Sequence, residues 1–87
     1  MKDEILFKMR LYLAELGDPV YSWSTEGVRA RSYAKTTVQY LINKVVDSDD
    51  PPSMVISEFI KEADKRCGLV YRVAYETAVD LYDHVIL

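Results

Sequence analysis

The chain has 87 residues, of which 49% are hydrophobic and 29% are charged, and its formal net charge is −3. These values are typical of a globular protein and exclude extensive disorder, which needs fewer apolar residues and a larger net charge. The length allows one hydrophobic core, so we expect a single domain over residues 1–87.

Composition also limits the covalent chemistry and the cellular location. Cys67 is the single cysteine, so no disulfide can form within the chain. The sequence has no run of about 18 apolar residues, which argues against a membrane span. Its first residues, Met1-Lys2-Asp3-Glu4, carry acids and lack the pattern of a signal peptide. We therefore expect a cytoplasmic protein.

The first helix is predicted over residues 3–16. Asp3 can cap its first turn, and Gly17 can take the left-handed position that ends it. Apolar residues recur at helical spacing and predict the buried face: Ile5, Leu6, Met9, Leu13 and Leu16. Phe7, Leu11 and Ala14 form a second, narrower stripe on the far side. Residues 17–24 are predicted to be a loop, in which Tyr21 or Trp23 could fold back over that stripe.

The second helix is predicted over residues 25–46, with Ser24 as its N-cap. Its apolar face consists of Ala30, Ala34, Val38, Leu41, Ile42 and Val45. The acidic segment 47–50 ends this helix, because negative charge at a helix C-terminus is unfavourable.

The third helix is predicted over residues 51–67, because Asp50 is an acidic cap and Pro51 suits the first helical position. Its apolar stripe consists of Val55, Ile56, Phe59, Ile60, Ala63 and Cys67. Gly68 is expected to close the helix.

The fourth helix, over residues 69–86, is the most apolar and is expected to be central. Its face consists of Val70, Ala74, Ala78, Leu81, Val85 and Ile86, with Tyr71, Tyr75 and Tyr82 beside it. No alternating pattern predicts a strand. The fold class predicted is therefore all-α, a compact bundle of four helices.

Positive charge is concentrated in the second helix, because residues 27–46 contain four cations and no acid. The cations and two interleaved tyrosines are Arg29, Arg31, Tyr33, Lys35, Tyr40 and Lys44. Cations with aromatic rings suit a phosphate backbone and stackable bases, and they equally suit an acidic protein partner. Alternatively, this helix faces the acidic third and fourth helices of its own bundle.

A second pattern consists of acidic residues one turn apart. Glu76, Asp80 and His84 share a face of the fourth helix, and Glu58 and Glu62 repeat the spacing on the third. Two carboxylate pairs on neighbouring helices could bind Mg²⁺ in a nucleotide-hydrolysing bundle. The competing interpretation is that all these carboxylates are solvated, and we predict no metal or cofactor.

No set of residues predicts catalysis. Cys67 and His84, the one possible nucleophile–base pair, are predicted on different faces, with Cys67 buried and His84 in solvent. The chain has no glycine-rich phosphate loop.

Apolar surface exceeds what one four-helix core needs, and the surplus residues are Phe7, Leu11, Val28, Val73, Val79 and Leu87. Seven tyrosines and one tryptophan also favour an interface, because aromatic side chains are enriched there. We expect an interaction surface at Phe7, Leu11, Tyr21 and Trp23, unless the two loop rings simply cover the stripe.

The sequence therefore favours a non-enzymatic helical module for protein–protein interaction or regulation, which forms homo-oligomers. The second hypothesis is a nucleic-acid-binding regulator that uses the basic helix. The third is a metal-dependent nucleotide hydrolase.

Overall fold

The computed structural model describes residues 2–17 and 25–87, which form four helices. These are α1 (Lys2–Leu16), α2 (Thr25–Asp47), α3 (Pro52–Asp64) and α4 (Leu69–Val85). The described residues contain no strand. The predicted all-α bundle of four helices is confirmed, and each helix begins and ends within three residues of its predicted bounds.

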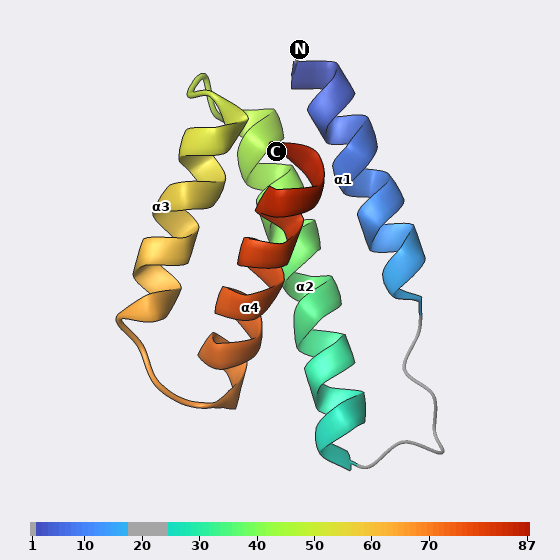
Figure 1. The fold of residues 1–87 in the computed structure, drawn as a ribbon, viewed down its shortest axis with the longest axis vertical. Helices are drawn as coiled ribbons and strands as arrows, with labels where there is room; N and C mark the ends of the chain where they lie inside the picture. The colour runs from blue at the N-terminus through green and yellow to red at the C-terminus, as the bar shows by residue number, and fades with distance from the viewer. Residues whose placement is uncertain (1, 18–24) are drawn as a thin grey trace.

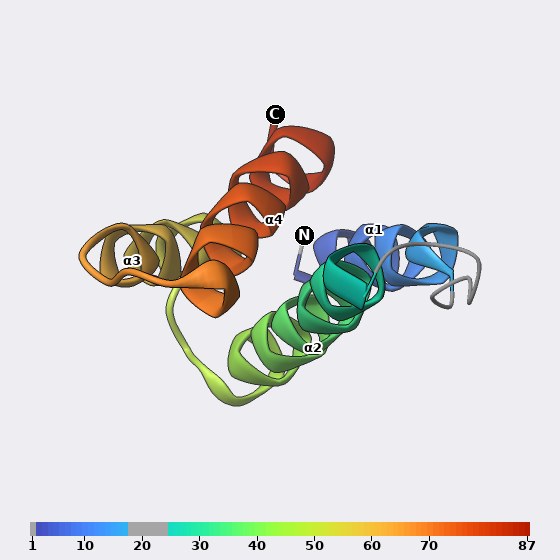
Figure 2. The same ribbon diagram turned by 90° about the horizontal axis from the view of Figure 1, so that it is seen from below.

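Consecutive helices run in opposite directions (Figure 1). Helix α4 packs against each of the other three, and α1 also packs along α2. Helix α3 lies on the other side of α4, where it packs chiefly on α4 and only lightly on α2 (Figure 2). No described helix has the length and apolar character needed to span a membrane.

The core forms where the apolar stripes of the four helices meet. It consists of Leu6, Met9, Val38, Leu41, Ile42, Val45, Ile56, Ala78, Leu81 and Val85. All ten residues belong to the predicted faces, so the 3.6-residue period located the core correctly. Two threonines, Thr37 and Thr77, are also buried. The buried hydroxyl of Thr37 has a hydrogen-bond partner, because it donates to the backbone oxygen of Tyr33 at 2.8 Å.

Helix α3 is shorter than predicted at both ends. Its N-cap is Pro51 rather than Asp50, because Pro52 disfavours the helical conformation in the residue before it and holds Pro51 at ψ 141°. At the other end, Lys65 and Arg66 donate to carbonyls three residues back, which tightens and ends the helix. Cys67 therefore leaves the apolar stripe and is exposed, so its predicted burial is wrong.

Two glycines occupy backbone conformations that other residues rarely adopt. Gly17 ends α1 at φ 66°, as predicted. Gly68 has φ 107° but is the N-cap of α4, where its carbonyl accepts the Arg72 amide at 3.0 Å. The prediction that Gly68 closes α3 is wrong, because α3 has already ended at Asp64.

Two valines of α4 differ from prediction in their burial. Val73, expected on the surface, is buried, whereas Val70, expected in the core, is half exposed. Val70 has the right angular position, but it lies in the first turn of α4, where it lines an open groove. Burial thus depends on how far the neighbouring helices extend as well as on the period of the stripe.

The burial of two leucines predicts that their substitution by alanine will lower the free energy of unfolding by very different amounts. Leu41 is fully buried between helices, whereas the Leu11 side chain on α1 is 47% exposed. We expect Leu41→Ala to lower the free energy of unfolding by about 2–5 kcal/mol, because it leaves a cavity. Leu11→Ala, the matched control, should cost less than about 1 kcal/mol. Urea titration measures both, and equal losses would contradict the described packing.

Candidate functional site

A groove of about 660 Å³ opens between α2 and α3, with the first turns of α4 as its floor. The groove is lined by Thr36, Thr37, Tyr40, Leu41, Lys44, Ser48, Asp50, Val55, Glu58, Phe59, Glu62, Ala63, Arg66, Val70, Tyr71 and Ala74. It exists because α2 and α3 both pack on α4 and barely on each other. The size falls in the range of protein sites that bind ligands.

Two aromatic rings meet across this groove. Tyr40 of α2 and Phe59 of α3 have ring centroids 5.6 Å apart at an interplanar angle of 45°. Tyr40 remains half exposed, and the Lys44 ammonium lies 5.8 Å from its ring centroid. The pair therefore presents aromatic surface to solvent, with a cation attracted to the face of the Tyr40 ring.

At the end of the groove near the α3–α4 link, a cation again lies over an aromatic ring. The guanidinium of Arg66 lies 5.4 Å from the ring centroid of Tyr71, and Val70 is half exposed beside them. A second hollow of about 660 Å³ continues from there, sharing Ala63, Arg66 and Tyr71 with the groove. It is bounded by an ion pair between Arg72 of α4 and Glu26 of α2, with N and O 3.3 Å apart.

The residues predicted for nucleic-acid binding divide between two edges of α2. Arg29, Tyr33, Tyr40 and Lys44 are spaced by about one or two turns, whereas Arg31 is rotated by about 200° from Arg29. Tyr40 and Lys44 line the groove. Arg31 lies on the α1 side, where its charge acts on Tyr12. Arg31 and Lys35 both have interactions within the chain. The six residues do not form one face.

The acidic candidates are likewise divided. Glu58 and Glu62 line the groove on the α3 side, whereas Asp80 and His84 lie at the α1–α4 contact. Glu76 is exposed on α4 and is not among the residues of either hollow. Within residues 2–17 and 25–87, no three His, Cys, Asp or Glu side chains come close enough to hold a metal ion.

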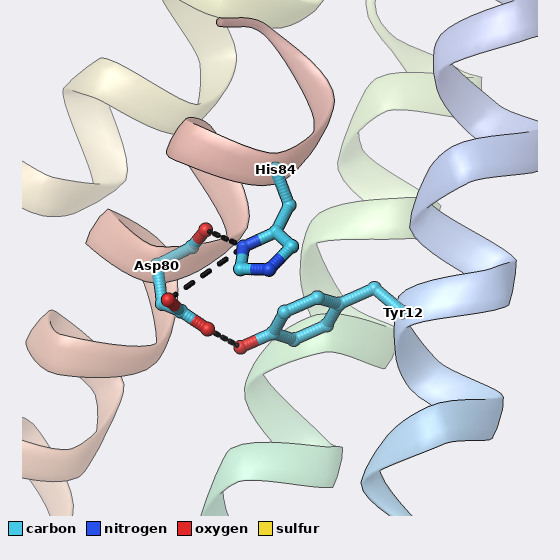
Figure 3. A network of polar contacts seen from close by, with 3 residues as sticks. All are labelled: Tyr12, Asp80 and His84. Carbon is cyan, nitrogen blue, oxygen red and sulfur yellow. Dashed lines mark hydrogen bonds and ion pairs between the residues drawn. The ribbon is translucent and has the colours of Figure 1, made fainter.

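Asp80 and His84 instead join a polar cluster with Tyr12, which links α1 to α4 (Figure 3). The Tyr12 hydroxyl donates to Asp80 Oδ2 at 2.6 Å. His84 Nδ1 donates to the backbone oxygen of Asp80 at 2.8 Å and lies 3.6 Å from Asp80 Oδ1. The rings of Tyr12 and His84 meet edge to face, with centroids 5.4 Å apart. This arrangement fastens two helices and leaves Asp80 with partners inside the chain.

The two titratable partners of Asp80, Tyr12 and His84, both have a raised pKa. Burial, together with the hydrogen bond to Asp80 and its charge, raises the pKa of Tyr12, while Arg31 opposes the shift. The backbone oxygen of Asp80 raises the pKa of His84, helped by the carboxylates of Asp80, Glu15 and Asp83. His84 is nevertheless exposed, as predicted.

The apolar stripe on α1 for which an interaction surface is predicted is exposed in the part of the chain that the structure describes. Phe7 is 62% exposed, and Leu11 and Ala14 follow it along one face of the helix. Tyr21 and Trp23, the other two predicted members, lie outside the described residues. The stripe and the groove are separate surfaces, because α1 contributes no residue to the groove.

The groove itself is not apparent from the sequence. Phe59 and Val70 were assigned to the core, and Tyr40 and Glu58 to two unrelated functional patterns. The sequence does contain one relevant pattern: polar and aromatic residues flank the apolar stripes of α2 and α3. The packing of both helices on α4 brings these flanking residues to opposite sides of one groove, and this packing cannot be read from the sequence.

Comparison with known protein families, with characterised proteins and with solved structures finds no match for this chain.

The raised pKa of His84 predicts a dependence of stability on pH. A group whose pKa is higher in the folded state stabilises that state below its unfolded pKa, near 6.5, and loses this contribution as pH rises through the folded pKa. His84 is the one histidine of the chain, so His84→Gln removes all histidine titration. We expect the melting temperature of the native protein to exceed that of the variant most at pH 5.5, and the difference to shrink toward pH 8.5.

Tyr12→Phe is the matched control for this experiment. It removes the hydrogen bond to Asp80, but the raised pKa of Tyr12 keeps the hydroxyl protonated over the whole range. Its effect on the melting temperature should therefore change less between pH 5.5 and 8.5 than that of His84→Gln, since Tyr12 itself does not titrate in this range. A His84→Gln difference that is flat, or that grows with pH, would show that His84 does not titrate as described.

Proposed function

We propose that this protein is a non-enzymatic interaction module that binds an amphipathic α-helix of a partner protein in the groove between α2, α3 and α4. The observation that carries the proposal is the gathering of half-exposed Tyr40, Val70 and Tyr71 in one hollow, with charged side chains at its rim. An apolar, aromatic centre with a charged rim is the usual anatomy of a protein interface.

The shape of the groove favours a helix as its occupant. Its α2 wall extends from Thr36 to Lys44 and its α3 wall from Val55 to Ala63. Each wall is therefore about 12 Å long, or slightly more than two helical turns. An amphipathic helix that presents apolar residues at i, i+3, i+4 and i+7 offers an apolar stripe long enough to cover both walls. Charge on the flanks of this stripe would remain at the rim.

A peptide experiment tests the groove. The probe is an acetylated and amidated 14-residue amphipathic helix with a leucine stripe and uncharged flanks, and binding is measured by calorimetry and by NMR shifts. Val70→Gln should weaken binding about tenfold, because it puts an amide into the apolar contact. Val46→Gln is the control, since Val46 is 48% exposed and Val70 47%, but Val46 does not line the groove.

The outcomes separate the possible occupants. Shifts confined to the groove residues, lost in Val70→Gln and kept in Val46→Gln, support the proposal. Failure of the peptide to bind the native protein, or equal weakening by both substitutions, would refute it. Concentration-dependent shifts of the same residues without peptide would show that a second copy occupies the groove instead.

Self-association through α1 is a second candidate function, which the exposure of Phe7 favours. In an antiparallel pair of α1 helices with Leu11 on the two-fold axis, residues whose numbers sum to about 22 face each other. Phe7 then meets the small Ala14 of the second copy, and Lys8 approaches its Glu15. Both the packing and the charges are complementary, and each contact occurs twice.

Light scattering over a concentration series measures this association. We expect dimers of the native protein at high micromolar concentration and monomers of Phe7→Gln. The control is Val46→Gln, which changes a similarly exposed apolar side chain on α2 and should leave the dimer intact. A native protein that stays monomeric up to millimolar concentration would exclude the α1 dimer without affecting the groove.

Nucleic-acid binding is less well supported, because Arg31 and Lys35 lie on a different edge of α2 from Arg29 and Lys44. We also propose a cytoplasmic location. Its support is Cys67, a free thiol that is exposed on the α3–α4 link and therefore suits a reducing compartment.

A further inference from the structure

The two walls of the groove carry opposite charges. The α2 wall has Lys44, whose ammonium lies over the ring of Tyr40. The facing α3 wall has Glu58 and Glu62, which are one turn apart and exposed. The aromatic contact between Tyr40 and Phe59 lies between the two walls. A helix laid along this contact would therefore have a cation on one flank and two carboxylates on the other.

The remaining charges do not cancel this difference between the walls. Glu62 lies 3.6 Å from Lys65 of its own chain, but both side chains are mostly exposed, and such pairs are weak. Arg66 is held over Tyr71 at the end of the groove near α4, and Asp50 lies at the opposite end, beside the α2–α3 link. These two residues act on the ends of an occupant rather than on its flanks.

We infer that the partner helix carries acidic residues on one flank of its apolar stripe and basic residues one turn apart on the other. This inference rests on the proposed function of the groove and adds the chemistry of the partner. The acidic flank lies against Lys44, and the basic flank lies against Glu58 and Glu62. The segregated charges also fix the direction of the helix, because turning it end for end would bring like charges together.

A second copy of this chain fits the pattern poorly. One flank of the exposed stripe of α1 carries both signs, because Glu4 and Lys8 lie there with their charged groups 3.7 Å apart. Arg10 and Asp3 mix the signs on the opposite flank in the same way. Because α1 lacks one acidic and one basic flank, the inference assigns the groove to a helix of a different protein.

Four peptides test the inference on the full chain. They share the leucine stripe of the neutral probe and differ only in their flanks, which are neutral, both acidic, both basic, or one acidic and one basic. At low salt we expect the peptide with one flank of each sign to bind about fivefold more tightly than either single-sign peptide. In 0.5 M NaCl the difference should fall below about twofold, because rim charges are screened.

Glu58→Lys tests the acidic wall, since it replaces one of the two carboxylates by a cation and cancels the net negative charge of the pair. The variant should bind the doubly acidic peptide more tightly than the native protein does, and the mixed peptide less tightly. Glu76→Lys is the matched control, because it makes the same charge change at an exposed position of α4 outside the groove. Its effect on each peptide should stay below about twofold.

The results distinguish this inference from the function on which it rests. Binding of the neutral peptide that Val70→Gln weakens, together with equal affinities for all three charged peptides, would overturn the inference and leave the groove as a binding site. The same conclusion follows if Glu58→Lys and Glu76→Lys have equal effects. If none of the four peptides binds, both proposals fail.

Discussion

The structure depends on the packing of α4 against all three other helices. Small residues make this possible, because Ala74 and Ala78 let neighbouring helices approach the α4 axis closely, while Leu81 and Val85 fill the volume farther along. Helices α1 and α2 also pack on each other, and the two close one side of the bundle. On the other side α2 and α3 both pack on α4 and make only a small contact with each other, which includes the rings of Tyr40 and Phe59, and the groove lies between them.

The two sides of α4 have different chemistry. Toward α1, the hydroxyl of Tyr12 and the ring of His84 surround Asp80, and their contacts hold helices together. Toward α2 and α3, aromatic rings and aliphatic side chains are left half exposed, with charges only at the edges. The first arrangement uses its polar groups internally. The second leaves its apolar groups available, and this contrast is why binding rather than catalysis is the function we propose.

The sequence was sufficient to predict the four helices, their approximate ends and the ten core residues. The periodic stripes and the proline and glycine signals are local, so they can be read without knowing the fold. The ends of α3 were less accurate, because two successive prolines and three-residue hydrogen bonds shifted them. The positions of Val70 and Val73 depend on how far other helices extend, which no local pattern contains.

The candidate site was predictable only in pieces. Tyr40 and Lys44 were singled out for their chemistry, as were Glu58 and Glu62, but each pair was attributed to a different activity. Their common location follows from the angle between α2 and α3, which is set by side-chain packing over the whole bundle. The polar cluster of Tyr12, Asp80 and His84 was missed for the same reason, because it joins residues 68 positions apart.

The dependence of α3 on one main neighbour has a consequence for the dynamics of the fold. Because α4 is the main neighbour of α3, an opening that separates these two helices would leave the contacts among α1, α2 and α4 in place. Such an opening would expose an apolar face of α3, because Ile56 and Ala63 are buried and Val55, Phe59 and Ile60 pack partly buried against the core. The proposed occupant of the groove, if it binds only the closed form, would protect the amides of α3 from hydrogen exchange to an extent that rises with its concentration.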